Sequence, residues 1–263
     1  MRKNRNYQHN EDHLSVISLK RTPHRLDNFF RRNCYTLNQW NVHVIDGVDG
    51  EQHREVFKQS RLVDHEVLQR WSPGAIGSAL SHMISWRQCL QLGKPMVVAE
   101  DDAILAKELK QNLNMLLQGT RKKTPFLLLG WNLDSILQAE LEPGLGLISL
   151  FDPAYPVEEE LTKLVNSETK RLICKLKRCF GLPAYRITPE TAELLLNKLN
   201  PIVSEPIPMG RGIPTHFSET LDGVLNNNYE ELEANIVFPP LALALNDQNE
   251  SLTRRRDPKN FHD

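Results

Sequence analysis

Three consecutive carboxylates directly follow a short apolar segment near the middle of the chain. The apolar segment is Met-Val-Val-Ala at 96–99, and the acids are Glu100, Asp101 and Asp102. A buried strand there would direct its carboxyl end into the crevice where α/β sheets bind ligands. Residues 100 and 102 share one face of an extended chain, and carboxylates suit Mg²⁺ or Mn²⁺, which often bridge to substrate phosphates. We therefore predict Glu100 and Asp102 as metal ligands; a solvated acidic turn is the alternative.

A glycine-containing turn and an amphipathic helix precede these acids. Gly74 and Gly77 allow a close backbone approach at the start of the helix, where N–H groups can bind a phosphate. Ser81 and His82 lie further along the same helix. We expect His82 to position a diphosphate or a metal ion; a histidine that simply packs near Trp86 is the alternative of similar weight.

A basic turn follows the first expected strand. Lys20, Arg21 and Arg25 lie there, and the planar, permanently charged fork of arginine suits a diphosphate. A solvated helix start would explain the same residues. At the end of the second expected strand, Asp46 is a candidate acceptor for a ribose or base group, and Asp49 is equally well explained as a turn former.

These segments together resemble the signature of glycosyltransferase family 25. That family includes galactosyltransferases of bacterial lipooligosaccharide synthesis and the collagen galactosyltransferases. The resemblance covers roughly residues 14–245, is strongest over 72–103 and is weak after 200. The segments that carry it are 16–23, 44–50, 74–77, 79–82, Trp86, 100–103, 127–130 and 184–188.

The resemblance implies a GT-A-like α/β fold, a mixed sheet with flanking helices that binds a nucleotide sugar. It also implies UDP-galactose as donor, inversion at the anomeric carbon, and Mn²⁺ or Mg²⁺. It places a catalytic acid after residue 215, with Asp222 as the best match and Glu219 as the rival. The implied donor-binding residues are Leu19, Lys20, Arg21, Arg25, Asp46, Gly74, Gly77, Ser81, His82 and Asp101.

Two other functions fit parts of this pattern. A non-catalytic relative that binds a sugar nucleotide would keep the fold, and the weak match after residue 200 leaves this option open. A metal-dependent phosphohydrolase would use the same acids but needs further ligands, such as an H-x-H cluster, which the sequence lacks.

Composition narrows the class of protein. The 263 residues are 40% hydrophobic and 25% charged, with a net charge of −1, which does not indicate a nucleic-acid partner. No apolar run approaches the roughly 18 residues that span a bilayer, and the polar first residues do not resemble a secretory signal. The four cysteines lack C-x-x-C spacing, so we expect reduced thiols and a cytoplasmic protein.

The hydrophobic periodicity predicts alternating strands and helices. The resemblance implies one domain over 14–245, with a donor and metal half at 14–130 and an acceptor half at 131–245. Residues 1–13 and 246–263 are expected to be flexible tails. Arg254, Arg255 and Arg256 in the second tail could contact anionic lipid at the inner membrane face, near a lipid-linked glycan acceptor.

The individual elements follow from the same pattern. Strands are expected at 14–19, 40–45, 96–99, 126–129, 144–150, 179–187 and 236–238. Helices are expected at 24–37, 75–91, 105–117, 189–199 and 221–229, with an insertion at 152–172 and a loop at 201–214.

Overall fold

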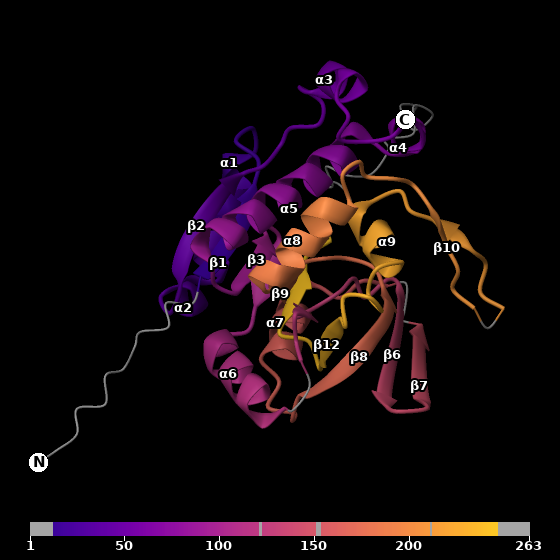
Figure 1. Cartoon of the computed structure of the whole chain (residues 1–263). Coiled ribbons are helices and arrows are strands. Elements are labelled where there is room, and N and C mark those ends of the chain that lie inside the picture. Colours follow the sequence, from indigo (N-terminus) through magenta and orange to yellow (C-terminus); the bar gives the residue numbers. More distant parts are fainter. Residues whose placement is uncertain (1–12, 121–122, 151–153, 211, 247–263) are drawn as a thin grey trace, which may run out of the picture.

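A mixed sheet of nine strands runs through the protein in the computed structural model, which describes residues 13–120, 123–150, 154–210 and 212–246 (Figure 1). The strand order is β2-β1-β3-β9-β5-β12-β8-β6-β7. In that order the strands are Asn41–Asp46, His13–Ser18, Met96–Glu100, Ala184–Ile187, Phe126–Leu128, Asn235–Phe238, Leu172–Cys179, Ile136–Glu142 and Leu145–Leu150. Two small antiparallel pairs accompany this sheet: β4 (Ala103–Leu105) with β13 (Ala242–Ala244), and β10 (Pro206–Ile207) with β11 (His216–Phe217).

The amino-terminal part of the sheet is parallel. β1 pairs in parallel with β2 on one side and with β3 on the other. Helix α1 (Pro23–Arg32) connects β1 to β2 along the chain, as the predicted strand–helix–strand order requires. The carboxyl ends of β1 and β3 therefore meet at one edge of the sheet, and β9 then pairs antiparallel to β3.

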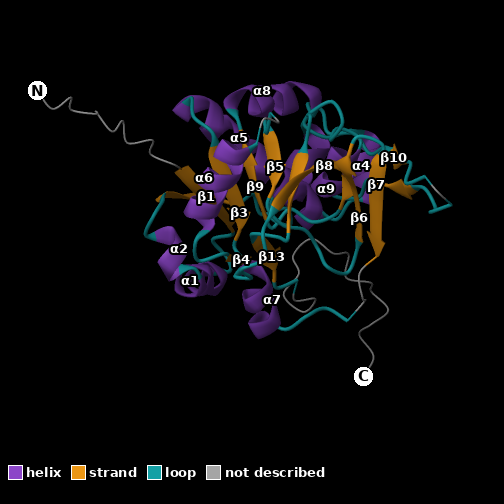
Figure 2. Cartoon of the chain, turned by 90° about the horizontal axis from the view of Figure 1, so that it is seen from below, coloured by secondary structure: helices purple, strands orange, loops and turns teal. Residues whose placement is uncertain are grey.

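Helices cover both faces of the sheet (Figure 2). Helices α5 (Pro73–Leu92), α8 (Pro189–Lys198) and α9 (Leu221–Asn226) pack on one face, and α1, α6 (Leu109–Gly119) and α7 (Glu158–Val165) pack on the other. β3 is buried on both sides, with Met96 and Val98 in the first core and Val97 and Ala99 in the second. This large mixed sheet with flanking helices confirms the predicted α/β class and agrees with a GT-A-like fold. The remaining helices are α2 (Cys34–Leu37), α3 (Arg54–Gln59) and α4 (His65–Arg70).

Helix α5 carries most of the motif that the sequence singled out. Ser72 caps it by accepting a hydrogen bond from the backbone N–H of Ala75 at 3.0 Å, and Pro73 occupies its first turn. Gly93 ends it in the left-handed conformation, at φ 62°. These local signals explain why the helix expected at 75–91 is present.

The helix expected at 24–37 is divided at Asn33. The buried Asn33 amide donates to the carbonyl oxygens of Phe29 and Ala103, and its carbonyl accepts from the backbone N–H of Leu105. Because this side chain serves β4 as well as the helix, α1 ends before it and α2 begins after it. The prediction of one continuous helix is wrong.

The helix expected at 105–117 begins later. Residues 103–105 form β4, which pairs antiparallel with β13, near the carboxyl-terminal end of the described chain. Helix α6 starts only at Leu109. The apolar run that suggested a helix is here a buried strand, because its partner lies far away in the sequence.

The strand expected at 179–187 is the last residue of β8 and a separate strand, β9, which run in the same direction with β5 and β12 between them in the sheet. The segment that connects them contains Gly181 at φ 88°. The same prediction missed most of β8. Buried Cys174 and Leu176 alternate there with Lys175 and Lys177, which is the period-two signal of a strand. β6 was also missed, and the tails expected at 1–13 and 246–263 lie almost entirely outside the described residues.

Candidate active site

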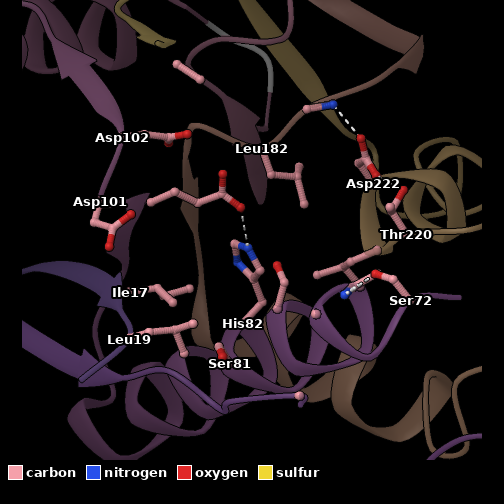
Figure 3. Close-up of a pocket in the computed structure, with 18 of the residues that line it drawn as sticks. Ile17, Leu19, Ser72, Ser81, His82, Asp101, Asp102, Leu182, Thr220 and Asp222 are labelled. Atoms are coloured by element: carbon pink, nitrogen blue, oxygen red, sulfur yellow. Dashed lines mark hydrogen bonds and ion pairs between the residues drawn. The ribbon is translucent and has the colours of Figure 1, made fainter. Parts of the chain in front are cut away.

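A cavity of about 460 Å³ lies at the carboxyl ends of β1 and β3, beside the amino terminus of α5 (Figure 3). The acids at the end of β3 line one side, and His82 on α5 lies beneath them. Thr220 and Asp222, at the start of α9, line the opposite side. Residues from both predicted halves of the chain thus share one cavity, at the sheet edge where α/β folds bind ligands.

Asp101 is a buried member of an ion pair. Its carboxylate accepts a hydrogen bond from the Ser18 hydroxyl at 2.7 Å and from Arg25 Nε at 2.8 Å, and Arg25 Nη2 lies 2.6 Å away. The side chain is only 7% exposed. Asp101 is therefore not part of a solvated acidic turn. Both Asp101 and Arg25 line the cavity, but each is the other's main partner.

Asp102 holds an unsatisfied acceptor. Within the described part of the chain, its buried Oδ1 has no hydrogen-bond partner, and its Oδ2 lies 3.7 Å from Arg25 Nη2. Burial raises the pKa of Asp102 most, and the neighbouring Glu100 charge adds to the rise. The pKa is about 7 as a result, although Arg25 opposes the rise. The strand ends at Glu100, so Asp102 reaches the cavity from the following turn and not by strand alternation.

These two acids fit a divalent cation. Asp102 Oδ1 is an orphaned oxygen, and Glu100 uses only Oε1 in hydrogen bonding within the described structure. Oxygen ligands of this kind suit Mg²⁺ or Mn²⁺. The described residues contain no group of three or more His, Cys, Asp or Glu arranged for a metal. A cation at this position would be held by the two carboxylates, with substrate phosphates and water completing the shell, as is usual for Mg²⁺.

His82 is almost fully buried, with 1% of its surface exposed, yet it reaches the cavity wall. Its Nε2 lies 3.2 Å from Glu100 Oε1, and its Nδ1 lies 3.0 Å from the Tyr185 hydroxyl. The structure thus agrees in part with each of the two roles that the sequence allowed for His82. The side chain is a satisfied core histidine, and it also contacts a cavity acid.

The start of α5 borders the cavity through Gly74 and Ala75. Ser81 also lines it, while its hydroxyl accepts from the Val48 N–H at 2.8 Å and donates to the Gly77 carbonyl. Gly77 is not part of the lining. A Cβ at that position would come within 2.3 Å of the Val48 carbonyl oxygen, so this glycine permits α5 to pack against the loop after β2. That Gly77 contacts the sugar-nucleotide donor directly stays a prediction.

The basic turn after β1 is divided between the cavity and the surface. Leu19 and Arg21 line the cavity, and Arg21 Nε pairs with the buried Asp49 carboxylate at 2.7 Å. Lys20 instead forms an exposed ion pair with Asp46 at 2.6 Å, and neither residue lines the cavity. This geometry therefore does not support the prediction that Lys20 and Asp46 contact the sugar-nucleotide donor.

Asp222 and Glu219 both line the cavity. Asp222 Oδ2 accepts from the Gly181 N–H at 2.6 Å, and its Oδ1 accepts from the Gly223 N–H at 2.9 Å and from the Thr220 hydroxyl. One acceptor position on Oδ2 remains, since a carboxylate oxygen accepts two hydrogen bonds. Glu219 is exposed and has no hydrogen bond or ion pair within the described residues. The base assignment stays a prediction for both.

Several residues of the lining were not predicted as site residues, among them Ser18, Arg70, Asn132 and Thr220. Ser18 ends the first strand, so its strand-end position was an available signal. Arg70 lies over the Phe217 ring at 4.5 Å, and no motif pointed to that contact. Asn132 abuts Gly181, where a Cβ would come within 2.4 Å of the Asn132 Oδ1.

Comparison with known protein families now agrees with this geometry. The family model for glycosyltransferase family 25, described as a lipopolysaccharide-biosynthesis protein, matches residues 11–209. The chain belongs to glycosyltransferase family 25 and is a glycosyltransferase of lipopolysaccharide biosynthesis.

The matched range includes the acid triplet but ends before Glu219 and Asp222. A search of curated proteins found no match. Among the helices in the described part of the chain, none combines the length and the apolar character needed to span a bilayer. Arg254, Arg255 and Arg256 lie outside the described residues.

Proposed function

We propose that the protein transfers a hexose, galactose from UDP-galactose, to a hydroxyl group of a glycan with inversion at the anomeric carbon. The observation that carries the proposal is one cavity that combines strand-end acids, a helix amino terminus and the Glu219–Asp222 segment. Its volume of about 460 Å³ falls in the range of small-molecule sites. The glycosyltransferase family supports a sugar-nucleotide donor and a glycan acceptor.

The amino-terminal half would bind the donor. Arg21 brings a positive charge to the cavity, and the start of α5 brings backbone N–H groups near Gly74, where an anionic phosphate is favoured. Arg25 is already paired with Asp101, so its main part is to hold that acid in place. The donor diphosphate would lie between this turn and the acids.

Glu100 and Asp102 would hold Mn²⁺ or Mg²⁺ through the oxygens that lack protein partners. A bound cation would supply charge neutralisation for the diphosphate leaving group. Burial keeps Asp102 poorly solvated, so its ionised form gains from any added positive charge.

The carboxyl-terminal half would act on the acceptor. Asp222, or Glu219 as the rival, would take the proton from the attacking hydroxyl. The acceptor oxygen forms a bond to the anomeric carbon, the bond from that carbon to the diphosphate oxygen breaks, and UDP leaves with the electron pair. Attack from the face opposite the leaving group inverts the configuration.

A non-catalytic sugar-nucleotide-binding protein and a metal-dependent phosphohydrolase remain the alternatives, and one experiment separates all three. UDP-, GDP- and CMP-sugars are each incubated with the protein and Mn²⁺, with and without a truncated lipooligosaccharide acceptor. A transferase forms a glycosylated product only when acceptor is present. A binding protein leaves every donor intact. A phosphohydrolase cleaves the UDP- and GDP-sugars to a nucleoside monophosphate and a sugar phosphate, at the same rate without acceptor.

We further propose that the protein works at the inner membrane face on a lipid-linked glycan. The support is the basic segment Arg254–Arg256 in the sequence, since each basic residue near an anionic surface contributes roughly 1 kcal/mol. Deletion of residues 252–263 should reduce binding to anionic vesicles and leave turnover on a soluble acceptor unchanged. Equal vesicle binding by the wild-type and the truncated protein would show that the tail does not contribute to membrane binding.

A further inference from the structure

Four side chains form a continuous hydrogen-bonded line from the core to the cavity. Trp86 Nε1 donates to the Tyr185 hydroxyl oxygen at 2.7 Å, the same hydroxyl lies 3.0 Å from His82 Nδ1, and His82 Nε2 lies 3.2 Å from Glu100 Oε1. Trp86 and Tyr185 have no measurable exposure, and neither lines the cavity. Figure 3 shows the last of these contacts as a dashed line from the ring of His82.

The chemistry of the four groups allows only one arrangement of protons. The indole N–H of Trp86 is a donor only, so it uses one lone pair of the Tyr185 oxygen. The Tyr185 hydroxyl must then donate its own proton, and His82 Nδ1 is its only other hydrogen-bond partner in the described structure. A buried hydroxyl proton without an acceptor is costly. His82 Nδ1 is therefore unprotonated, and the ring proton is on Nε2, facing the Glu100 carboxylate.

Burial supports this arrangement from the tyrosine side. It raises the pKa of Tyr185 well above the usual range of a phenol, so the hydroxyl keeps its proton. The Tyr185 ring also stacks on Phe126, with ring centroids 5.0 Å apart. The hydroxyl is thus held in place from two directions, by the stacked ring and by Trp86.

We propose that Tyr185 and His82 form a positioning relay, in which the tyrosine fixes the Nε2–H tautomer of His82 and the histidine aims the Glu100 carboxylate. His82 takes up Oε1, so Oε2 stays available toward the cavity. Second-layer hydrogen bonds of this kind commonly set the orientation and affinity of metal ligands. The claim that the relay orients a metal ligand rests on the proposed function, whereas the claim about the His82 tautomer does not depend on it.

The tautomer can be measured without any ligand. Long-range ¹H–¹⁵N correlation spectra of the metal-free protein report which nitrogen of each of its nine histidines carries the proton. The signals of His82 are identified by their absence in His82→Gln. We expect the Nε2–H form for His82 and a mixture of tautomers in Tyr185→Phe. An Nδ1–H or doubly protonated His82 in the wild-type protein would overturn the relay.

The consequence for Glu100 is tested with Mn²⁺ alone by titration calorimetry. Tyr185→Phe should raise the dissociation constant for Mn²⁺ about ten- to hundredfold, the usual effect of losing an outer-layer partner. The matched control is Tyr229→Phe. Tyr229 is equally buried and its ring also lies beside Phe126, but its hydroxyl has no hydrogen-bond partner in the described chain.

Tyr229→Phe should leave Mn²⁺ affinity within about twofold of wild type, since it removes an oxygen that bonds nothing. Equal losses in both variants would reduce Tyr185 to a packing role and contradict the relay. His82→Gln keeps an N–H donor within reach of Glu100, so it should retain more Mn²⁺ affinity than His82→Ala. If the wild-type protein binds no Mn²⁺, the proposed function fails, and the tautomer measurement still decides whether the relay exists.

Discussion

Replacing Asp102 with asparagine should stabilise the metal-free protein while removing cation binding. The wild-type carboxylate is held where burial and the Glu100 charge disfavour ionisation, and its Oδ1 has no partner within the described residues. Asparagine has nearly the same shape and no charge. A site selected for function often costs stability in this way.

The size of the effect follows from the pKa shift. A rise from 3.8 to about 7 is roughly three units, and each unit corresponds to ~1.4 kcal/mol, so the ceiling is about 4 kcal/mol at pH 8. The Asp102 side chain as a whole is 25% exposed, and the new amide is also polar. We therefore expect Asp102→Asn to raise the free energy of unfolding by about 1–3 kcal/mol at pH 8.

The sign depends on pH. The folded wild-type protein binds the Asp102 proton more tightly than the unfolded chain does, so stability from this group is full below pH 3.8 and is lost as pH rises through about 7. Asparagine does not titrate. The advantage of the variant should therefore grow between pH 4 and pH 8, while all other groups titrate equally in both proteins.

Urea unfolding in EDTA at pH 5 and pH 8, followed by tryptophan fluorescence, measures this difference. Calorimetry with Mn²⁺ on the same preparations measures cation binding. A variant that is less stable than wild type at pH 8, or a difference that does not change with pH, would refute the description of Asp102 as a strained functional acid.

Three further predictions concern other parts of the cavity. Arg21→Ala should weaken UDP binding about three- to tenfold in calorimetry because a cavity cation is lost, whereas the exposed control Lys58→Ala should not; equal affinities in all three proteins would make Arg21 a turn residue only. Arg25→Ala should lower the free energy of unfolding by about 3–5 kcal/mol because it leaves the buried Asp101 unpaired, and a loss below about 1 kcal/mol in urea unfolding would contradict the buried ion pair. Asp222→Asn should lower turnover about 10²-fold or more with UDP affinity retained; normal turnover in the variant would exclude it as the base.

The sequence predicted the elements whose signals are local. Ser72, Pro73 and Gly93 mark the two ends of α5 directly, and the run at 96–99 followed by acids located β3 and its strand end. Both elements position the site, which is why most predicted donor and metal residues do line one cavity. Lys20, Asp46 and Gly77 were expected there on sequence position alone, and they lie outside its lining.

The remaining features depend on partners that are remote along the chain. Asn33 divides a helix because its amide bonds to Ala103 and Leu105, about 70 positions later. The burial of the Asp101 carboxylate is explained by its ion pair with Arg25. The tautomer that we propose for His82 is explained by its contact with the Tyr185 hydroxyl. Each of these residues alone fits several roles equally well, and only the fold shows which group faces it.

The most direct test of the central claim is the cation dependence of UDP binding. Wild-type protein is titrated with UDP in Mn²⁺ and again in EDTA, and the double variant Glu100→Gln/Asp102→Asn is titrated in Mn²⁺ after its fold is checked by circular dichroism. We predict one binding event in Mn²⁺, which is lost in EDTA and in the double variant, because the diphosphate needs the cation that the two acids hold. Equal UDP affinity in all three titrations would contradict a metal-dependent donor site at the end of β3.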